Sequence, residues 1–465
     1  MSPLQEHPAA LACATPNTLN TSSTPAAPLP ADSAAPAYPA WGTPPSERYE
    51  ALAQNLRPVF ARIRASAVER DLQRRLPHDE IRWLRAAGFT RLRLPAAQGG
   101  QAATLTELFG LLVELGEADT NVVNALRAHL GFTEEVLSAD PSPWRDFWLE
   151  RLSQGELIGA GLSEAGPAQV GSFATRLSRG PEGWRLDGRK FYTTGSLFAD
   201  WISVAAQDHE GNTHYLQVAR QAPGVEVVDD WDGFGQALTA SGTAIFTQVA
   251  LEDIWIKPGA ARFPYAVPFY QLVHLASLAG IGRALAGDVA RRLQQRDRVY
   301  SHGNSASAAQ DPQLLQVVGR AHAAAYTAGA LTLHASQAVQ RSHDAHRQRA
   351  DPGEARFQTH PQTQTQTQTQ TQAQTQAAIL AHVEVDQAVS VLTRLVLEAS
   401  TELFDALGAS ATLRQAGLDR YWRNARTISS HNPRVYRERQ VGDFAVNGAA
   451  PPTYYRVGTS AAGTL

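Results

Sequence analysis

Residues 159–206 read GAGLSEAGPAQVGSFATRLSRGPEGWRLDGRKFYTTGSLFADWISVAA, and this stretch decides the fold because its periodicity differs from that on either side. Short runs of β-branched and aromatic residues alternate with polar residues between turns that contain Gly or Pro, which is typical of short strands. The same alternation continues in THYLQVA, residues 213–219, and in TAIFTQVAL, residues 243–251. We therefore expect a small antiparallel β-domain over residues 155–258.

Helical periodicity flanks this β-domain on both sides. Before it, apolar residues recur at three- and four-residue spacing, which places them on one face of a helix. They are Leu105, Leu108, Phe109, Leu112 and Leu115. After it, long helical runs return over Leu285–Tyr300 and Ile379–Leu407. The sequence therefore predicts an α+β chain with an N-terminal helical domain over residues 47–154 and a C-terminal helical domain over residues 259–465.

Two segments of biased composition stand outside this pattern. Residues 1–46 are dominated by Ala, Pro, Ser and Thr, and they carry too little apolar surface to offset the entropy of ordering the chain. We expect a disordered tail there. Residues 351–376 contain QTQTQTQTQTQ within a helical region, and we expect this segment to be a polar, low-complexity loop.

The composition of the 465 residues argues against several classes of protein. The formal net charge is -3 and no basic stripe is present, so the electrostatic pattern that nucleic-acid binding requires is missing. Cys13 is the single cysteine, which rules out an intramolecular disulfide and a thiolate metal cluster. We see no signal peptide and no run near the ~18 apolar residues of a membrane-spanning helix. We expect a soluble, cytoplasmic protein without a metal, since no His or carboxylate pair has metal-ligand spacing.

Residues 74–119 read RRLPHDEIRWLRAAGFTRLRLPAAQGGQAATLTELFGLLVELGEAD. In residues and spacing this segment resembles the N-terminal signature of the acyl-CoA dehydrogenase superfamily, and residues 159–206 resemble its flavin-embracing β-domain. The matching positions of the N-terminal segment are Pro77, Gly88, Pro95 and the pair Gly99 and Gly100. The resemblance covers about residues 47–447. It implies the acyl-CoA dehydrogenase fold, with an N-terminal helical bundle, a middle antiparallel β-domain and a C-terminal helical bundle.

An acyl-CoA dehydrogenase needs a carboxylate base, and many members use a glutamate near the C-terminus. Residues 424–426, Asn-Ala-Arg, resemble the family's Asp-Ala-Lys/Arg frame, and counting from them places Asn432 at that glutamate's position. An amide has no protonation equilibrium near neutral pH, so it cannot act as a base. A dehydrogenase would have to recruit another carboxylate, such as Glu164, Glu398 or Glu402.

The C-terminal segment matches a different subgroup of the superfamily. Residues 419–433, DRYWRNARTISSHNP, and residues 441–448, VGDFAVNG, resemble the hallmark of the reduced-flavin monooxygenases, which include dibenzothiophene monooxygenases and sulfur-acquisition oxidoreductases. The resemblance implies a flavoprotein oxidoreductase of sulfur metabolism. Reduced FMN from a separate flavin reductase would react with O2, forming a C4a-hydroperoxyflavin that oxygenates a small organosulfur compound. It also implies a homo-tetramer or dimer.

Three residues match catalytic positions of the dibenzothiophene monooxygenases. They are His129 in ALRAHLGF, Ser163 in GLSEAG and His431 in SSHNP. Histidine suits such a site because its unperturbed pKa of about 6.5 lets it exchange protons near neutral pH. The site should also be closed, since water would decompose the reactive flavin species.

Further residues match positions that hold the flavin in the superfamily. Tyr192 and Thr194 correspond to an aromatic residue beside the flavin ring and a hydroxyl near flavin N5, and Ser163 corresponds to a second hydroxyl near the flavin. Members that bind FAD carry a Gly-Gly-x-Gly-like stretch, of which one glycine, Gly408, remains here, so FMN is favoured over FAD. The phosphate of FMN needs cations. The candidates are Arg296, Arg298, Arg423 and Arg426.

Two other functions remain open at this point. The first is a FAD-dependent acyl-CoA dehydrogenase with a displaced base, which predicts tightly bound FAD and anaerobic reduction by an acyl-CoA. The second is a non-catalytic binding protein on the same scaffold, which predicts that no flavin binds.

Overall fold

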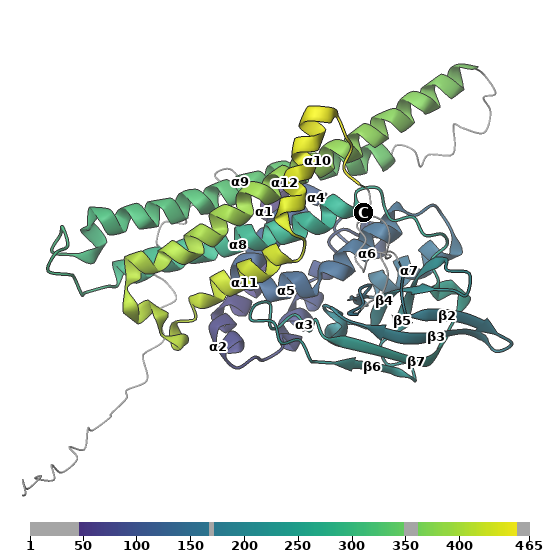
Figure 1. Ribbon diagram of the computed structural model, residues 1–465, viewed down its shortest axis with the longest axis horizontal. Helices are drawn as coiled ribbons and strands as arrows, with labels where there is room; N and C mark the ends of the chain where they lie inside the picture. The colour runs from purple at the N-terminus through teal and green to yellow at the C-terminus, as the bar shows by residue number, and fades with distance from the viewer. Residues whose placement is uncertain (1–45, 167–171, 348–360, 453–465) are drawn as a thin grey trace, which may run out of the picture. The chain divides into compact units, whose positions relative to one another are not determined.

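The computed structural model describes residues 46–166, 172–347 and 361–452, and of residues 361–369 it describes the backbone only (Figure 1). The predicted tail, residues 1–46, lies outside the described residues except for Ser46. That serine caps the first helix, because its side chain accepts a hydrogen bond of 3.0 Å from the amide of Tyr49.

Helices form the first part of the described chain (Figure 1). They are α1 (Glu47–Ala65), α2 (Ala67–Leu72), α3 (His78–Ala86), α4 (Leu105–Ala118), α5 (Thr120–Ala125), α6 (Arg127–Ser138) and α7 (Pro143–Ser153). The start of α4 is fixed by a capping box, in which the Thr104 hydroxyl and the Glu107 carboxylate each bind the other residue's amide. Buried residues cover nearly the whole circumference of α4, so this helix belongs to the core.

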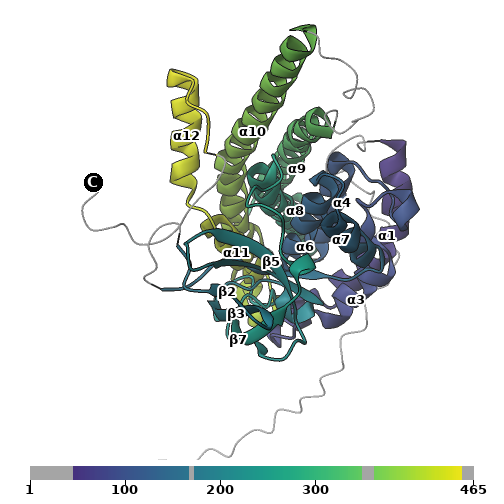
Figure 2. The same ribbon diagram turned by 90° about the vertical axis from the view of Figure 1, so that its right-hand side faces the viewer.

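One seven-stranded sheet follows the first group of helices. Its strands are β1 (Ile158–Gly161), β2 (Arg176–Gly180), β3 (Gly183–Lys190), β4 (Trp201–Gln207), β5 (Thr213–Ala219), β6 (Val225–Val228) and β7 (Thr243–Leu251). The strand order is β1-β4-β2-β3-β7-β6, and β5 pairs with β4. Figure 2 shows β2, β3 and β7 next to one another below the long helices.

The sheet is mixed, so the expectation of a purely antiparallel sheet was wrong in part. Strand β1 pairs with β4 in parallel over four residues, and β2 meets β4 in parallel at one position, while the remaining pairs are antiparallel. The alternation of apolar and polar residues fixes which face of a strand is buried, but it does not encode the direction of the neighbouring strand.

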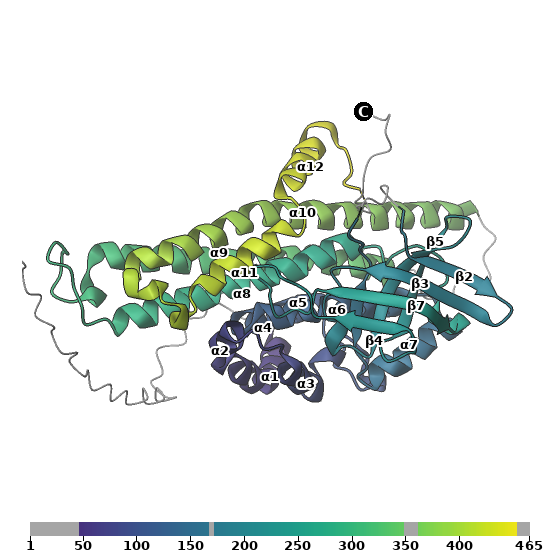
Figure 3. The same ribbon diagram turned by 60° about the horizontal axis from the view of Figure 1, so that its bottom comes forward.

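Long helices form the last part of the described chain. They are α8 (Ala266–Gln294), α9 (Pro312–Arg347), α10 (Pro361–Leu407), α11 (Asp419–Ser430) and α12 (Arg434–Asn447). Helices α8, α9 and α10 pack against one another, and α11 lies against α8 and α10 (Figure 3). By length and composition α8 could cross a membrane, but most of its apolar stretch is buried inside the protein, as in the core helix of a globular fold.

Two expectations for these helices need correction. Helix α8 ends at Gln294, six residues before the predicted end at Tyr300, because the polar run QQRDR that follows has no apolar face to bury. Residues 361–376, predicted to be a loop, form the first turns of α10, and residues 351–360 lie outside the described part. Pro361 suits a helix start, and no Gly or Pro follows it before the helix predicted from Ile379.

Candidate active site

Two histidines meet where the first third of α8 faces the end of α11. The rings of His274 and His431 lie 4.7 Å apart between centroids and are tilted by 47°. His274 is 8% exposed, and neither of its ring nitrogens has a hydrogen-bond partner among the described residues. Buried polar atoms are almost always hydrogen-bonded in folded proteins, so the bare nitrogens of His274 indicate a ligand or water that completes the site.

His431 lies at the C-terminal end of α11 and is exposed. Burial among neighbouring protein atoms is the main reason why its pKa falls to about 3, and the charge of Arg127 lowers it further. The side-chain nitrogen Nδ2 of Asn432 donates a hydrogen bond of 3.2 Å to Nδ1 of His431. This leaves the proton of the neutral ring on Nε2.

Arg127 stands beside both histidines at the start of α6. Its Nε donates to the carbonyl of Tyr270 over 3.3 Å, and its guanidinium lies 4.8 Å from the centre of the Tyr270 ring. Gly131, one turn further along α6, makes this arrangement possible, because a Cβ there would lie 2.1 Å from Oη of Tyr270. Burial lowers the pKa of Arg127 to about 10, so the guanidinium remains charged at neutral pH.

The loop between β6 and β7 ties this region to the sheet. The amide of Gln236 donates to Oδ1 of Asn424 on α11 over 2.7 Å, and Nδ2 of Asn124 on α5 donates to the side-chain oxygen of Gln236 over 2.8 Å. The backbone of Gln236 and of Ala240 is left-handed, with φ of 52° at each. Non-glycine residues with left-handed backbone angles are strained, and such residues cluster at functional sites.

Hydroxyl groups line the side of the site that the sheet contributes. Thr194 and Ser241 share a hydrogen bond of 2.7 Å, and Ser241 shares another of 2.7 Å with Thr239. Tyr192, two residues before Thr194, has a left-handed φ of 60° and is 52% exposed, and its ring packs edge-on to Trp231. The structure therefore brings Tyr192 and Thr194 to one edge of the β region, next to the loop that binds α11.

Ser163 lies beside the same segment, because its carbonyl accepts a hydrogen bond of 3.0 Å from the amide of Phe191. The next residue, Glu164, is fully engaged: Lys190 lies 2.6 Å away, and two backbone amides and the Thr175 hydroxyl also donate to it. Although burial opposes ionisation, these donors hold the pKa of Glu164 below its ordinary value. This carboxylate is therefore poorly suited to be a displaced base.

His129 occupies a different environment from His431. Its Nε2 donates to the carbonyl of Thr90 over 2.8 Å, and the side chain is 1% exposed. Burial lowers the pKa of His129 to about 4, and Nδ1 has no partner among the described residues. The partner that the structure gives to His431 is His274, which the sequence-based prediction passed over because a single histidine on an apolar helix usually has a structural role.

The predicted phosphate-binding residues fall into two groups. Arg296 and Gly408 lie together, since Nη1 of Arg296 donates to the carbonyl of Ala406 over 2.8 Å and a Cβ at Gly408 would lie 3.6 Å from Nη2 of Arg296. Nε of Arg296 donates to the carbonyl of Arg298, whose own side chain is exposed. The 20 residues of α8 from His274 to Gln294 span about 30 Å at a rise of 1.5 Å per residue. This group therefore lies at the opposite end of α8 from the histidine pair.

The other two arginines lie on α11 itself. Arg423 already binds Asp71 at 2.5 Å and Asp419 at 2.8 Å, so its charge is neutralised within the protein. Arg426 is exposed, and within the described residues no hydrogen bond or ion pair engages its guanidinium. Of these two, Arg426 is the one with a charge available to a phosphate.

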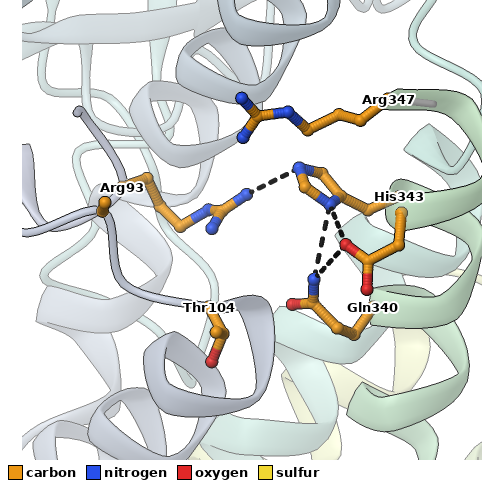
Figure 4. Close-up of a pocket in the computed structure, with 7 residues that line it drawn as sticks. Arg93, Thr104, Gln340, His343 and Arg347 are labelled. Carbon is orange, nitrogen blue, oxygen red and sulfur yellow. Dashed lines mark hydrogen bonds and ion pairs between the residues drawn. The ribbon is translucent and has the colours of Figure 1, made fainter. Parts of the chain in front are cut away.

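A hollow of about 390 Å³ lies between the start of α4 and the end of α9 (Figure 4). Its polar groups bind one another: Nη2 of Arg93 lies 3.3 Å from Nε2 of His343, and Nδ1 of His343 lies 2.9 Å from the Asp344 carboxylate. Gln340 donates to Asp344 and accepts from the first amide of α4. None of the residues predicted to be functional lines this hollow.

No family model matches the chain. It is 26% identical over 430 residues to the probable FMNH2-dependent monooxygenase SfnC of Pseudomonas putida, covering 89% of this chain and 98% of that protein. It is also 24% identical over 404 residues to a dibenzothiophene monooxygenase of Rhodococcus erythropolis, covering 83% and 91%.

Solved structures are similar over almost the same length. TdsC from Paenibacillus sp. A11-2 in complex with FMN and indole has a TM-score of 0.73 at 24% identity, covering 87% of this chain and 98% of that one. Methanesulfinate monooxygenase MsuC from Pseudomonas fluorescens has a TM-score of 0.74 at 22% identity, covering 86% and 98%. These likenesses confirm the acyl-CoA dehydrogenase fold, while the predicted domain bounds stay a prediction.

Proposed function

We propose that this chain is an FMNH2-dependent monooxygenase, which uses reduced FMN and O2 to oxygenate a small organosulfur compound. It is a relative of the FMNH2-dependent monooxygenases of the acyl-CoA dehydrogenase superfamily. The observation that carries this proposal is the contact between the neutral rings of His274 and His431. Asn424, on the helix that ends at His431, binds the loop that carries Ser241, and Ser241 shares a hydrogen bond with Thr194. Asn432, where a dehydrogenase would carry its base, binds His431 instead.

The residues of this region fit a flavin. We place the ring between the β-domain, residues 155–258, and the C-terminal helical domain, with Thr194 near N5 and Tyr192 beside the ring. The hydroxyl chain from Thr194 through Ser241 to Thr239 supplies neutral donors, which suit a ring whose electron density changes during turnover. When bound, FMN supplies the two electrons and activates the oxygen.

His431 and Ser163 exchange and orient protons in this proposal. A neutral imidazole with its proton on Nε2 donates a hydrogen bond at that nitrogen and can take up and return a proton at Nδ1. His129 keeps only Nδ1 for such a role, because its Nε2 binds Thr90.

The position of Arg296, Arg298 and Gly408, predicted to bind the flavin phosphate, supports an assembly of several chains. Arg296, Arg298 and Gly408 lie about 30 Å along α8 from the histidines, farther than the ribityl chain of one FMN molecule reaches. We propose that these residues hold the phosphate of a flavin bound mainly by a second copy, in a homo-tetramer or dimer. Arg426 remains the candidate for a phosphate contact within the same chain.

We further propose a cellular location and a partner protein for the enzyme. A separate flavin reductase would supply reduced FMN, and a cytoplasmic location, in sulfur metabolism, suits an enzyme that depends on reduced flavin from another protein.

The experiment that tests the function is oxygen-isotope labelling. The protein is incubated with a flavin reductase, NADH, FMN and 18O2, together with methanesulfinate, dibenzothiophene or related organosulfur compounds. The proposal predicts a product that carries one 18O atom, formed only when this protein is present. Bleaching of tightly bound FAD by an acyl-CoA, with no labelled product, would instead indicate a dehydrogenase.

A further inference from the structure

Arg127 is a half-buried cation without a counter-ion among the described residues. Within them its one hydrogen bond is to the carbonyl of Tyr270, and no carboxylate forms an ion pair with it. Arg262 provides the contrast: it also reaches Tyr270, through a hydrogen bond of 2.9 Å to the hydroxyl, but it pairs with Glu135 at 2.7 Å. A charge that is partly withdrawn from water gains from a partner of opposite charge, so Arg127 indicates an anionic ligand.

The two histidines extend this donor set. Tyr270, on which Arg127 rests, lies four residues before His274 on α8, so the two share one face of the helix. A neutral imidazole carries one N–H, which His431 has on Nε2, and the nitrogens of His274 have no partner among the described residues. The charged groups acting on these rings are the arginines Arg127 and Arg437, with no carboxylate among them.

We propose that Arg127, His274 and His431 bind the oxyanion of the substrate, which makes the substrate a small organic acid anion such as a sulfinate. This inference rests on the proposed function and narrows it. A charged guanidinium with neighbouring N–H donors matches the oxygens of such a group, whereas a neutral sulfur heterocycle would leave the cation unpaired.

The reaction balances for a sulfinate. One atom of O2 forms a bond to the sulfur, which is oxidised by two electrons to a sulfonate. The other oxygen atom is reduced to water by the two electrons and two protons of FMNH2. The overall change is RSO2⁻ + O2 + FMNH2 → RSO3⁻ + H2O + FMN. The anion keeps its charge throughout, so the same three residues hold both substrate and product.

Binding can be measured without turnover. Methanesulfinate, benzenesulfinate and acetate are titrated calorimetrically into the full-length protein saturated with oxidised FMN, with dimethyl sulfoxide as the neutral control. We expect at least one of the anions to bind and dimethyl sulfoxide not to bind. Arg127→Gln should weaken anion binding by about ten-fold or more, while Arg127→Lys should retain most of it. The matched control is Arg262→Gln, whose arginine already has a carboxylate partner and should leave anion binding unchanged.

The outcomes separate this inference from the proposed function. Equal anion binding by wild type and Arg127→Gln, or binding of none of the three anions, overturns the inference. So does a loss of affinity for FMN, but not for riboflavin, in Arg127→Gln, since Arg127 would then bind the flavin phosphate. The proposed function is tested separately by 18O labelling of both sulfinates and neutral organosulfur compounds. A labelled product from any of them supports the function, and a labelled product from neutral compounds alone would overturn the inference and leave the function standing.

Discussion

The backbone amide of Gln236 donates a 2.7 Å hydrogen bond to Oδ1 of Asn424, and this contact joins the loop that follows β6 to the helix that ends at His431. Asn424 is buried and Gln236 has a left-handed backbone. The contact therefore holds a strained loop against the helix that carries His431 at its end.

Replacing Asn424 by Ala should lower the free energy of unfolding by about 1–3 kcal/mol, because the buried amide of Gln236 loses its acceptor. The variant should also bind FMN more weakly, since the loop carries the hydroxyls of Thr239 and Ser241. Chemical denaturation and fluorescence titration measure the two effects. An Asn424→Asp variant keeps an acceptor at Oδ1 and serves as the control. Unchanged stability in Asn424→Ala would mean that the contact does not hold the loop.

His431→Ala should lower the rate of product formation by about 100-fold or more, as expected when a proton-exchanging side chain is removed. Affinity for FMN should change little, because the one hydrogen bond that the ring makes within the described residues is to Asn432. Steady-state assays with a flavin reductase, paired with FMN titration, measure this. A product yield equal to that of the wild type would remove His431 from the chemistry.

The buried His129 should make stability depend on pH. Its pKa of about 4 in the folded protein lies below the value of about 6.5 expected when unfolded, so only the unfolded chain binds a proton between these values. Stability is then lost as the pH falls from about 6.5 to 4, at about 1.4 kcal/mol per pH unit for this group. His129→Gln, which keeps a donor for Thr90, should reduce the slope by that amount in denaturation at several pH values. An unchanged slope would show that His129 is not the group responsible.

Shared flavin sites can be tested by mixing variants. Arg296→Ala and Thr194→Val should each weaken flavin binding, because each removes one half of every site. When the two variants are unfolded and refolded together, some sites combine an intact Arg296 with an intact Thr194 and should regain FMN binding. Each variant refolded alone is the control. If the mixture binds no more FMN than the separate variants, the two halves do not belong to one site.

Much of the fold could be predicted from the regular spacing of apolar residues along the chain. The helix from Leu105 and the strand Thr243–Leu251 follow directly from their apolar spacing. The parallel pairing of β1 with β4 could not be predicted, because alternation carries no strand direction. The helical state of residues 361–376 was missed because low complexity predicts disorder while backbone propensity decides the conformation.

The candidate site was predictable only in part. The structure places Tyr192 and Thr194 at one edge of the sheet with Ser163 next to them, while His431 contacts His274. Neither Arg127 nor His274 stood out, since one arginine on a short helix and one histidine on an apolar helix are usually structural. The usable signal was that His274 is the one titratable group in the apolar stretch QLVHLASLAG, where an uncompensated polar side chain needs a reason.

The most direct test of the monooxygenase account is a rapid-mixing experiment. Anaerobic protein with reduced FMN is mixed with oxygenated buffer, and the flavin absorbance is followed. The account predicts a transient spectrum that belongs to neither reduced nor oxidised FMN and that decays slowly compared with the oxidation of free reduced flavin. Direct oxidation of FMNH2 in a single step, at the rate of free flavin and without a transient, would contradict it.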